Sequence, residues 1–187
     1  MMILVTGGSG SGKSAFAEDC VLACGEKKRI YIATMYPFDQ ESKKRVLRHR
    51  KMRAGKEFDT EECYVGLKNV KIPKHSCVLL ECLSNLTANE MFQENGAKEK
   101  VVEEILEGVK NLNRQAEQVV IVTNEIFSDG IEYDEETKQY QKYLGEINAK
   151  LAGWAQEVTE VVYGIPVQYK KTENKEGQKN GKIMEQL

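Results

Sequence analysis

The first fourteen residues constrain the fold of this chain more than any other segment. An apolar run, Met2-Ile-Leu-Val5, leads directly into Gly-Gly-Ser-Gly-Ser-Gly-Lys-Ser at positions 7–14, which is a complete G-x-x-x-x-G-K-[ST] pattern. An amphipathic stretch that begins at Ala15 follows. The pattern therefore has the strand before it and the helix after it that a phosphate-binding loop requires.

The residue types in this loop match the parts of a triphosphate. Glycines let backbone N–H groups turn inward around phosphate oxygens, and the helix N-terminus adds positive potential. Lys13 is expected to neutralise the β and γ phosphates, and the Ser14 hydroxyl is expected to ligate Mg²⁺. The alternative, a flexible Gly/Ser loop, requires neither flanking element. The predicted phosphate ligands are Gly7, Gly8, Ser9, Gly10, Ser11, Gly12, Lys13 and Ser14.

Length and charge limit what the loop can belong to. At 187 residues the chain is long enough for one α/β domain with a substantial core. The formal net charge of −2 and the pI of about 5.9 argue against nucleic-acid binding, because basic and acidic residues are mixed along most of the chain. We therefore expect a small-molecule substrate.

Cysteine usage and hydropathy give an expectation about location. The five cysteines form no C-x-x-C pair, and an odd number without a secretory signal is typical of a reducing compartment. We expect ordinary thiols, mostly buried. No apolar segment approaches the roughly 20 residues that span a bilayer, and the first strand leads into the loop without a cleavable leader. The sequence predicts a cytoplasmic protein without a membrane span.

Strands and helices are expected to alternate along the chain. The runs at 2–5, 77–81 and 119–123 are apolar apart from the closing Glu81 and Thr123, which favours burial on both faces of a largely parallel sheet flanked by helices. A polar segment, 170–187, is expected to be a weakly ordered tail after a single domain at 1–169. Further strands are predicted at 29–34, 158–163 and 165–169, and helices at 13–24, 39–53, 83–92, 98–116 and 135–157.

A phosphate-binding loop is usually accompanied by a metal-binding carboxylate at the end of a neighbouring strand. Glu81 ends the strand Val78-Leu-Leu and is the preferred candidate, while Glu125 follows the strand at 119–123 and is the second. Either carboxylate might instead cap the next helix, although Ser84 or Asn85 has the side chain for that role.

A second chemical centre lies in the basic segment 45–53. On a helix, Arg45, His49 and Arg53 fall at i, i+4 and i+8, so an imidazole would lie between two guanidinium groups. Such a face suits a polyphosphate, and neighbouring positive charge favours a neutral, nucleophilic imidazole. The alternative is a solvated basic helix face. His75, beside Lys74, is expected at the surface.

Several motifs together resemble one family. They are Tyr31-Ile-Ala-Thr34, the Arg-His-Arg segment, Leu79-Leu-Glu-Cys-Leu83, Val122-Thr-Asn-Glu125 and Leu144-Gly-x-Ile-Asn148. From residue 1 to about 169, the chain resembles the bifunctional adenosylcobinamide kinases and adenosylcobinamide-phosphate guanylyltransferases of cobalamin biosynthesis. The resemblance implies a P-loop NTPase-like α/β fold and a homotrimer. It also implies phosphorylation of the corrinoid adenosylcobinamide with ATP or GTP, and transfer of GMP from GTP through a guanylylated histidine.

The resemblance also implies roles for individual residues. His49 matches the guanylylated histidine, although some relatives carry two adjacent histidines and this chain has Arg48 at the first position. Glu62 is expected to contact the base or ribose, and Glu81, with Ser14, to hold Mg²⁺. No kinase base can be named. The remaining residues expected to contact the nucleotide are Ala33, Thr34, Met35, Arg50, Lys51, Met52 and Arg53.

Two other functions fit the residues. The first is a P-loop kinase of another small metabolite, with the basic helix serving only to clamp phosphate. The second is a nucleotide-dependent regulatory module. Covalent labelling of the protein by GTP distinguishes the first alternative from the bifunctional enzyme, and the absence of turnover with any acceptor would favour the second.

Overall fold

The protein folds around one seven-stranded sheet. The structure, a computed structural model, describes residues 1–128 and 130–172, apart from the side chains of Arg45 and Met52. The strand order is β3-β2-β4-β5-β1-β6-β7, and all neighbouring strands are parallel except β6 and β7. The strands are β1 (Met2–Thr6), β2 (Arg29–Ala33), β3 (Phe58–Glu62), β4 (Cys77–Glu81), β5 (Gln118–Val122), β6 (Glu157–Val162) and β7 (Ile165–Lys171).

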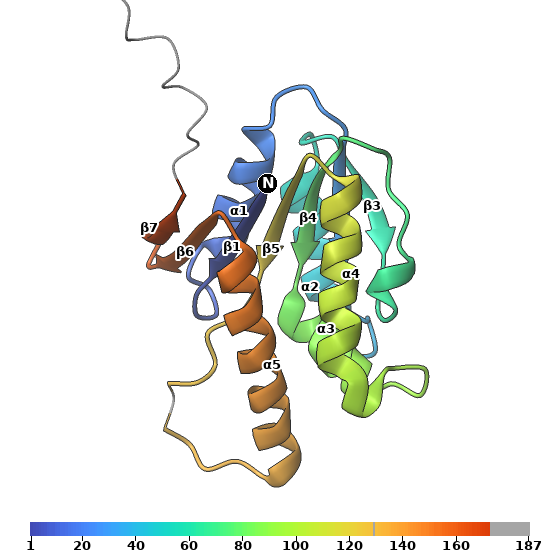
Figure 1. Ribbon diagram of the computed structural model, residues 1–187, viewed down its shortest axis with the longest axis vertical. Coiled ribbons are helices and arrows are strands. Elements are labelled where there is room, and N and C mark those ends of the chain that lie inside the picture. The colour runs from blue at the N-terminus through green and yellow to red at the C-terminus, as the bar shows by residue number, and fades with distance from the viewer. Residues whose placement is uncertain (129, 173–187) are drawn as a thin grey trace, which may run out of the picture.

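Helices cover both faces of this sheet (Figure 1). One hydrophobic cluster joins the sheet to the helices that carry Leu83, Ile105 and Leu144, and a second joins the opposite face to Ala17 and Val21. The largely parallel, doubly covered α/β fold predicted from the sequence is confirmed. The helices are α1 (Lys13–Leu22), α2 (Gln40–Arg53), α3 (Leu83–Phe92), α4 (Val101–Gln115) and α5 (Glu135–Trp154), with short 3₁₀ turns η1 (Leu67–Asn69) and η2 (Lys98–Lys100).

The sheet differs from the sequence prediction mainly at its edges. Strand β3 was not predicted, because its sequence Phe-Asp-Thr-Glu-Glu is polar and four of its five residues are exposed. At the other edge, β6 and β7 form an antiparallel hairpin around Gly164, and β7 continues to Lys171, two residues beyond 169. Residues 173–187 of the expected tail lie outside the described residues.

The cysteines differ from the expectation of five free thiols. The structure joins Cys24, which follows α1, to Cys77 at the start of β4 in a disulfide. Sequence spacing gave no sign of this pair, because 53 residues separate the two cysteines and only the fold brings them together. The remaining three, Cys20, Cys63 and Cys82, are free, and two of them are buried. Among the described residues, no helix has the length and apolar character needed to cross a membrane.

Candidate functional site

The phosphate-binding loop connects β1 to α1 at the carboxyl edge of the parallel strands. Gly7, Gly10 and Gly12 all have positive φ, a conformation that glycine adopts without steric cost. The loop is supported from behind by the β6–β7 hairpin: Gly164 donates its N–H to Ser11 O at 2.8 Å. A Cβ at Gly7 would lie 2.5 Å from Val161 O, so this support leaves no space for a side chain there.

Lys13 occupies the centre of the loop. Its ammonium donates to Gly8 O at 2.9 Å, and the residue is 8% exposed. Burial lowers the pKa of Lys13 below its usual value, while the nearby Cys82 and Glu81 act in the opposite direction. An ammonium has three N–H donors, so one that donates to a loop carbonyl has donor capacity left for a phosphate oxygen.

Glu81, at the end of β4, connects the loop to the rest of the site. One carboxylate oxygen, Oε1, accepts a 2.8 Å hydrogen bond from the Ser14 hydroxyl, and Oε2 accepts one of 2.6 Å from the Tyr31 hydroxyl. The Tyr31 pKa is raised, first by burial and then by the Glu81 charge. Tyr31 therefore stays protonated and holds the carboxylate in place.

The second acidic candidate from the sequence lies in a different arrangement. Glu125 Oε1 accepts hydrogen bonds from the Phe127 N–H at 2.9 Å and from the Ser128 hydroxyl at 2.8 Å. Its carboxylate thus stabilises the loop after β5. Because Ser14 contacts Glu81, the geometry favours Glu81 as the acidic partner of the loop.

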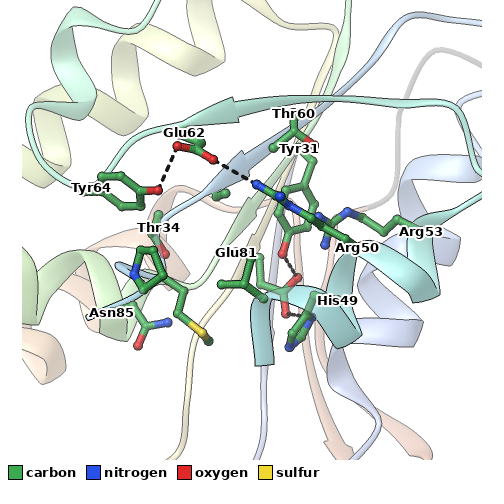
Figure 2. A pocket seen from close by; sticks show the side chains of 14 residues that line it. Tyr31, Thr34, His49, Arg50, Arg53, Thr60, Glu62, Tyr64, Glu81 and Asn85 are labelled. Carbon is green, nitrogen blue, oxygen red and sulfur yellow. Dashed lines mark hydrogen bonds and ion pairs between the residues drawn. The ribbon is translucent and has the colours of Figure 1, made fainter. Parts of the chain in front are cut away.

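The helix α2 brings His49 to the same carboxylate. Asp39 begins the helix by accepting the Ser42 N–H at 2.6 Å in a capping box, a strong helix-start signal. His49 Nδ1 then lies 3.3 Å from Glu81 Oε1, and Figure 2 shows the imidazole directed at the carboxylate from below. The two atoms form no hydrogen bond, and Nδ1 is buried without a hydrogen-bond partner among the described residues.

This arrangement corrects the expected surroundings of His49. The sequence predicted an imidazole between the guanidinium groups of Arg45 and Arg53. Instead, a carboxylate faces the ring, and Arg53 lies with its guanidinium carbon 3.3 Å above the Tyr31 ring centre. The side chain of Arg45 lies outside the described residues. A hydrogen bond from Nδ1 to this carboxylate would hold the proton on that nitrogen and leave the lone pair on Nε2.

His49 and Glu81 line one pocket with most of the residues outside the phosphate-binding loop that were expected to bind nucleotide, whereas none of residues 7–14 is among its lining residues. Arg50 crosses the pocket to Glu62, with 3.1 Å between nitrogen and oxygen, and Tyr64 donates to the other Glu62 oxygen at 2.9 Å (Figure 2). The pocket is lined by Tyr31, Ala33, Thr34, Met35, Pro37, Val46, His49, Arg50, Arg53, Thr60, Glu62, Tyr64, Glu81 and Asn85.

Among the described residues of α2 that were expected to bind nucleotide, Lys51 is not brought to this pocket. Lys51 is exposed and lines a separate surface depression with Lys44, Leu47 and Arg48. The side chain of Met52 lies outside the described residues. His75 is at the surface as expected, with 81% of its side chain exposed.

The sequence reasoning missed several lining residues. Tyr31 was assigned only to a strand, and Thr60 and Tyr64 belong to or follow the unpredicted β3. The available signal was a tyrosine hydroxyl in an otherwise apolar strand, since a buried hydroxyl requires a polar partner. Thr34 also has a structural role: its hydroxyl accepts the Cys82 N–H at 2.6 Å and donates to Cys82 O at 2.8 Å, which fixes the end of β2 to the end of β4.

Comparison with known proteins assigns the chain to a family. Residues 3–169 match the family model described as cobinamide kinase / cobinamide phosphate guanyltransferase. The chain belongs to this family. Two relatives named bifunctional adenosylcobalamin biosynthesis protein CobU, from Salmonella typhimurium and Escherichia coli, are each 32% identical in an alignment of length 185 that covers 91% of this chain and 100% of theirs. The predicted enzyme class, a kinase and nucleotidyltransferase that uses nucleotides, is confirmed.

Solved structures with a similar fold are distant in sequence. A prototypical ATPase from the type III secretion system of pathogenic bacteria has a TM-score of 0.49 and 10% identity, covering 89% of this chain and 56% of that one. A KaiC-like protein from Pyrococcus horikoshii has a TM-score of 0.46 and 15% identity, covering 85% and 71%. Neither similarity bears on the function of the cobinamide kinase / cobinamide phosphate guanyltransferase family.

Proposed function

We propose that one nucleotide site serves both reactions of this family, with His49 as the residue that carries GMP. The observation that supports this proposal is the shared carboxylate: Glu81 Oε1 contacts both Ser14 of the phosphate-binding loop and Nδ1 of His49. A triphosphate on Gly7–Ser14 is thus adjacent to the imidazole. Covalent catalysis requires such a short separation between nucleophile and electrophile.

In the transferase reaction, His49 Nε2 attacks the α-phosphorus of GTP. The new P–N bond forms as the bond from that phosphorus to the bridging oxygen breaks, and pyrophosphate leaves with the electron pair. A phosphate oxygen of the corrinoid phosphate then attacks the same phosphorus, and the P–N bond breaks to release the imidazole. Arg50 and Arg53, which line the pocket, supply positive charge where phosphate oxygens accumulate negative charge.

In the kinase reaction, the hydroxyl of adenosylcobinamide attacks the γ-phosphorus of ATP or GTP. Lys13 is placed to stabilise the charge on the transferred phosphoryl group. Ser14 Oγ and Glu81 Oε1, 2.8 Å apart, are the hard oxygen donors that Mg²⁺ prefers, so these two residues would hold the ion. When bound, Mg²⁺ neutralises phosphate charge.

The remaining parts of the proposal follow from the family. The acceptor is the corrinoid adenosylcobinamide or its phosphate, the protein assembles as a homotrimer, and the reactions take place in the cytoplasm. The nucleotide contacts include Ala33, Thr34, Met35 and Glu62, all of which line the pocket.

The test is the fate of GMP on the protein. Incubation with α-³²P-GTP and Mg²⁺ should label the wild type, and peptide mapping should place GMP on His49. The label should be lost in acid and retained in alkali, as for a phosphoramidate. His49→Ala should remove the label and the formation of GDP-cobinamide but retain kinase turnover, whereas Lys13→Ala should remove both activities. Normal labelling of His49→Ala, or a label on His75, would exclude this nucleophile and leave a kinase with a basic clamp.

A further inference from the structure

A second, much larger depression adjoins the nucleotide pocket. We call it the acceptor groove; it has a volume of about 1110 Å³, against about 60 Å³ for the pocket at His49. This exceeds the roughly 300–1,000 Å³ that usually accommodates a drug-sized ligand. The groove lies where β3 ends, between the segment after it and the end of α3. It is lined by Tyr36, Glu61, Glu62, Cys63, Tyr64, Val65, Gly66, Asn69, Val70, Lys71, Gln93, Glu94 and Asn95.

The acceptor groove is continuous with the nucleotide pocket. Glu62 and Tyr64 line both, and the Tyr64 hydroxyl donates to Glu62 at 2.9 Å at the boundary. Tyr36 packs edge-to-face on Tyr64, with 5.1 Å between ring centres. Its neighbours Met35 and Pro37 face the nucleotide pocket. A ligand in the groove can therefore extend one arm past Tyr64 toward Glu81 and His49.

The charge of the acceptor groove opposes nucleotide binding. Its lining contains three carboxylates, Glu61, Glu62 and Glu94, and one ammonium, Lys71. Glu62 is paired with Arg50 of the neighbouring pocket at 3.1 Å, so Glu61 and Glu94 against Lys71 leave the groove acidic. Phosphates would be repelled from such a surface, whereas a cation would be attracted. The groove therefore differs in charge from the pocket beside it, which contains Arg50 and Arg53.

The uncharged lining residues suit an amide-bearing ligand. Asn69, Gln93 and Asn95 present carboxamides, which donate and accept hydrogen bonds at the same time. Primary amides on a ligand have the same dual character. The Tyr36–Tyr64 pair adds a flat aromatic surface, which favours contact with a planar ring.

We propose that the acceptor groove binds the corrin ring of the substrate and directs its aminopropanol arm into the nucleotide pocket. Adenosylcobinamide combines cobalt(III), a monoanionic corrin and a carbanionic adenosyl ligand, so its core is a monocation fringed with amides. These properties match the acidic, carboxamide-lined groove, and the boundary shared at Glu62 and Tyr64 gives the arm a route into the nucleotide pocket. This inference rests on the proposed function, because it assigns the second substrate of the same site.

The test reverses the groove charge and measures corrinoid binding separately from GMP transfer. In Glu61→Lys/Glu94→Lys, equilibrium dialysis should show a Kd for adenosylcobinamide about fivefold above that of the wild type, because two attractive exposed charges become repulsive. The Kd for dicyanocobinamide, whose core is neutral, should change by less than about twofold. The matched control Glu99→Lys/Glu146→Lys alters the net charge equally on exposed positions outside the groove and should bind both corrinoids as the wild type does.

A steric variant tests the location independently of charge. Asn95→Trp places a large side chain in the groove and should raise the Kd of both corrinoids by about tenfold or more. Labelling by α-³²P-GTP should be normal in every groove variant, since that step requires no corrinoid. If GTP does not label the wild type but the groove variants still bind corrinoids more weakly, the proposed nucleophile is wrong and the groove assignment stands.

Two results would overturn the assignment of the groove. One is wild-type corrinoid affinity in both Glu61→Lys/Glu94→Lys and Asn95→Trp, or an equal loss in the control. The other is an altered oligomeric mass of the groove variants by light scattering with unchanged corrinoid affinity, which would identify the groove as a contact between copies of the chain.

Discussion

At the scale of single residues, the site depends on how Glu81 is held. Its two oxygens contact the Ser14 hydroxyl, the Tyr31 hydroxyl and His49 Nδ1, so a loop, a strand and a helix meet at one carboxylate. The sequence indicated this residue from its position at a strand end. It gave no sign of the Tyr31 contact, because that contact joins neighbouring strands whose register only the fold defines.

Replacing this carboxylate should alter metal use. In Glu81→Gln, we expect the Mg²⁺ concentration for half-maximal turnover to rise by about tenfold or more, since an amide oxygen is a poorer ligand for a hard cation than a carboxylate. The matched control is Glu125→Gln, whose carboxylate stabilises the loop at Phe127 and Ser128. Titration of kinase activity with Mg²⁺ measures the effect. A rise in the half-maximal Mg²⁺ concentration in Glu125→Gln alone would mean that the metal binds at the end of β5.

The burial of Lys13 predicts an alkaline limit to nucleotide binding. Burial lowers the pKa of Lys13 below 10.5, so the ammonium loses its charge at a lower pH than an exposed lysine. Binding needs the charged form, and affinity should therefore fall as the pH rises through the lowered value. Glu81→Gln removes one of the opposing charges and should move the midpoint to still lower pH.

This pH effect can be measured without turnover. A fluorescent GTP analogue titrated in EDTA from pH 7 to 10.5 separates lysine ionisation from metal binding. Lys13→Ala should bind weakly, with little dependence on pH over this range. If the wild type and Lys13→Ala show the same dependence of nucleotide affinity on pH, ionisation of Lys13 is not the cause of the weaker binding at alkaline pH.

At the scale of elements, the buried strands could be predicted from the sequence and an exposed one could not. Strands β1, β4 and β5 could be recognised because both faces are buried, which makes their sequences largely apolar. Helix α2 could be located from its Asp39 cap even though eight of its fourteen residues are charged. Strand β3 could not, because an exposed edge strand needs neither apolar alternation nor a turn signal, and several of the missed pocket residues lie on it or beside it.

One contact between elements sets the position of the segment behind the acceptor groove. Gly108 of α4 packs on Leu67 of η1, where a Cβ would meet the Leu67 Cβ at 2.7 Å. Gly108→Ala must therefore separate the two elements and should lower the free energy of unfolding by about 1–3 kcal/mol, the usual effect of overpacking. Gly153 of α5, where an added Cβ meets nothing within 4 Å, is the matched control.

The two helical glycines should respond with opposite signs. Gly153→Ala should raise the free energy of unfolding by up to about 1 kcal/mol, because alanine is the better helix former. Urea denaturation measures both changes. Equal effects in the two variants would mean that η1 moves freely with α4, and the close packing would then have no influence on the groove.

At the scale of the whole molecule, the β6–β7 hairpin lies at one edge of the sheet, beside the phosphate-binding loop (Figure 1), and several of its apolar side chains are exposed. Tyr163 at the turn is 94% exposed, and Ile165 and Val167 of β7 are 65% and 41% exposed. Long, apolar edge strands of this kind are usually covered by another chain. Since Gly164 also supports the loop through Ser11, contacts between chains at this hairpin would influence nucleotide binding.

We therefore expect the homotrimer to form through the hairpin. Ile165→Lys/Val167→Lys places two ammonium groups on the exposed face of β7 and should shift the mass in light scattering from three copies of the 21.2 kDa chain toward one, because burying unpaired charge at an interface is strongly unfavourable. Leu47→Lys, at an apolar residue that is 56% exposed on α2, is the control and should remain trimeric. A trimer that persists in the hairpin variant would locate the interface elsewhere, and a monomeric wild type would exclude the trimer itself.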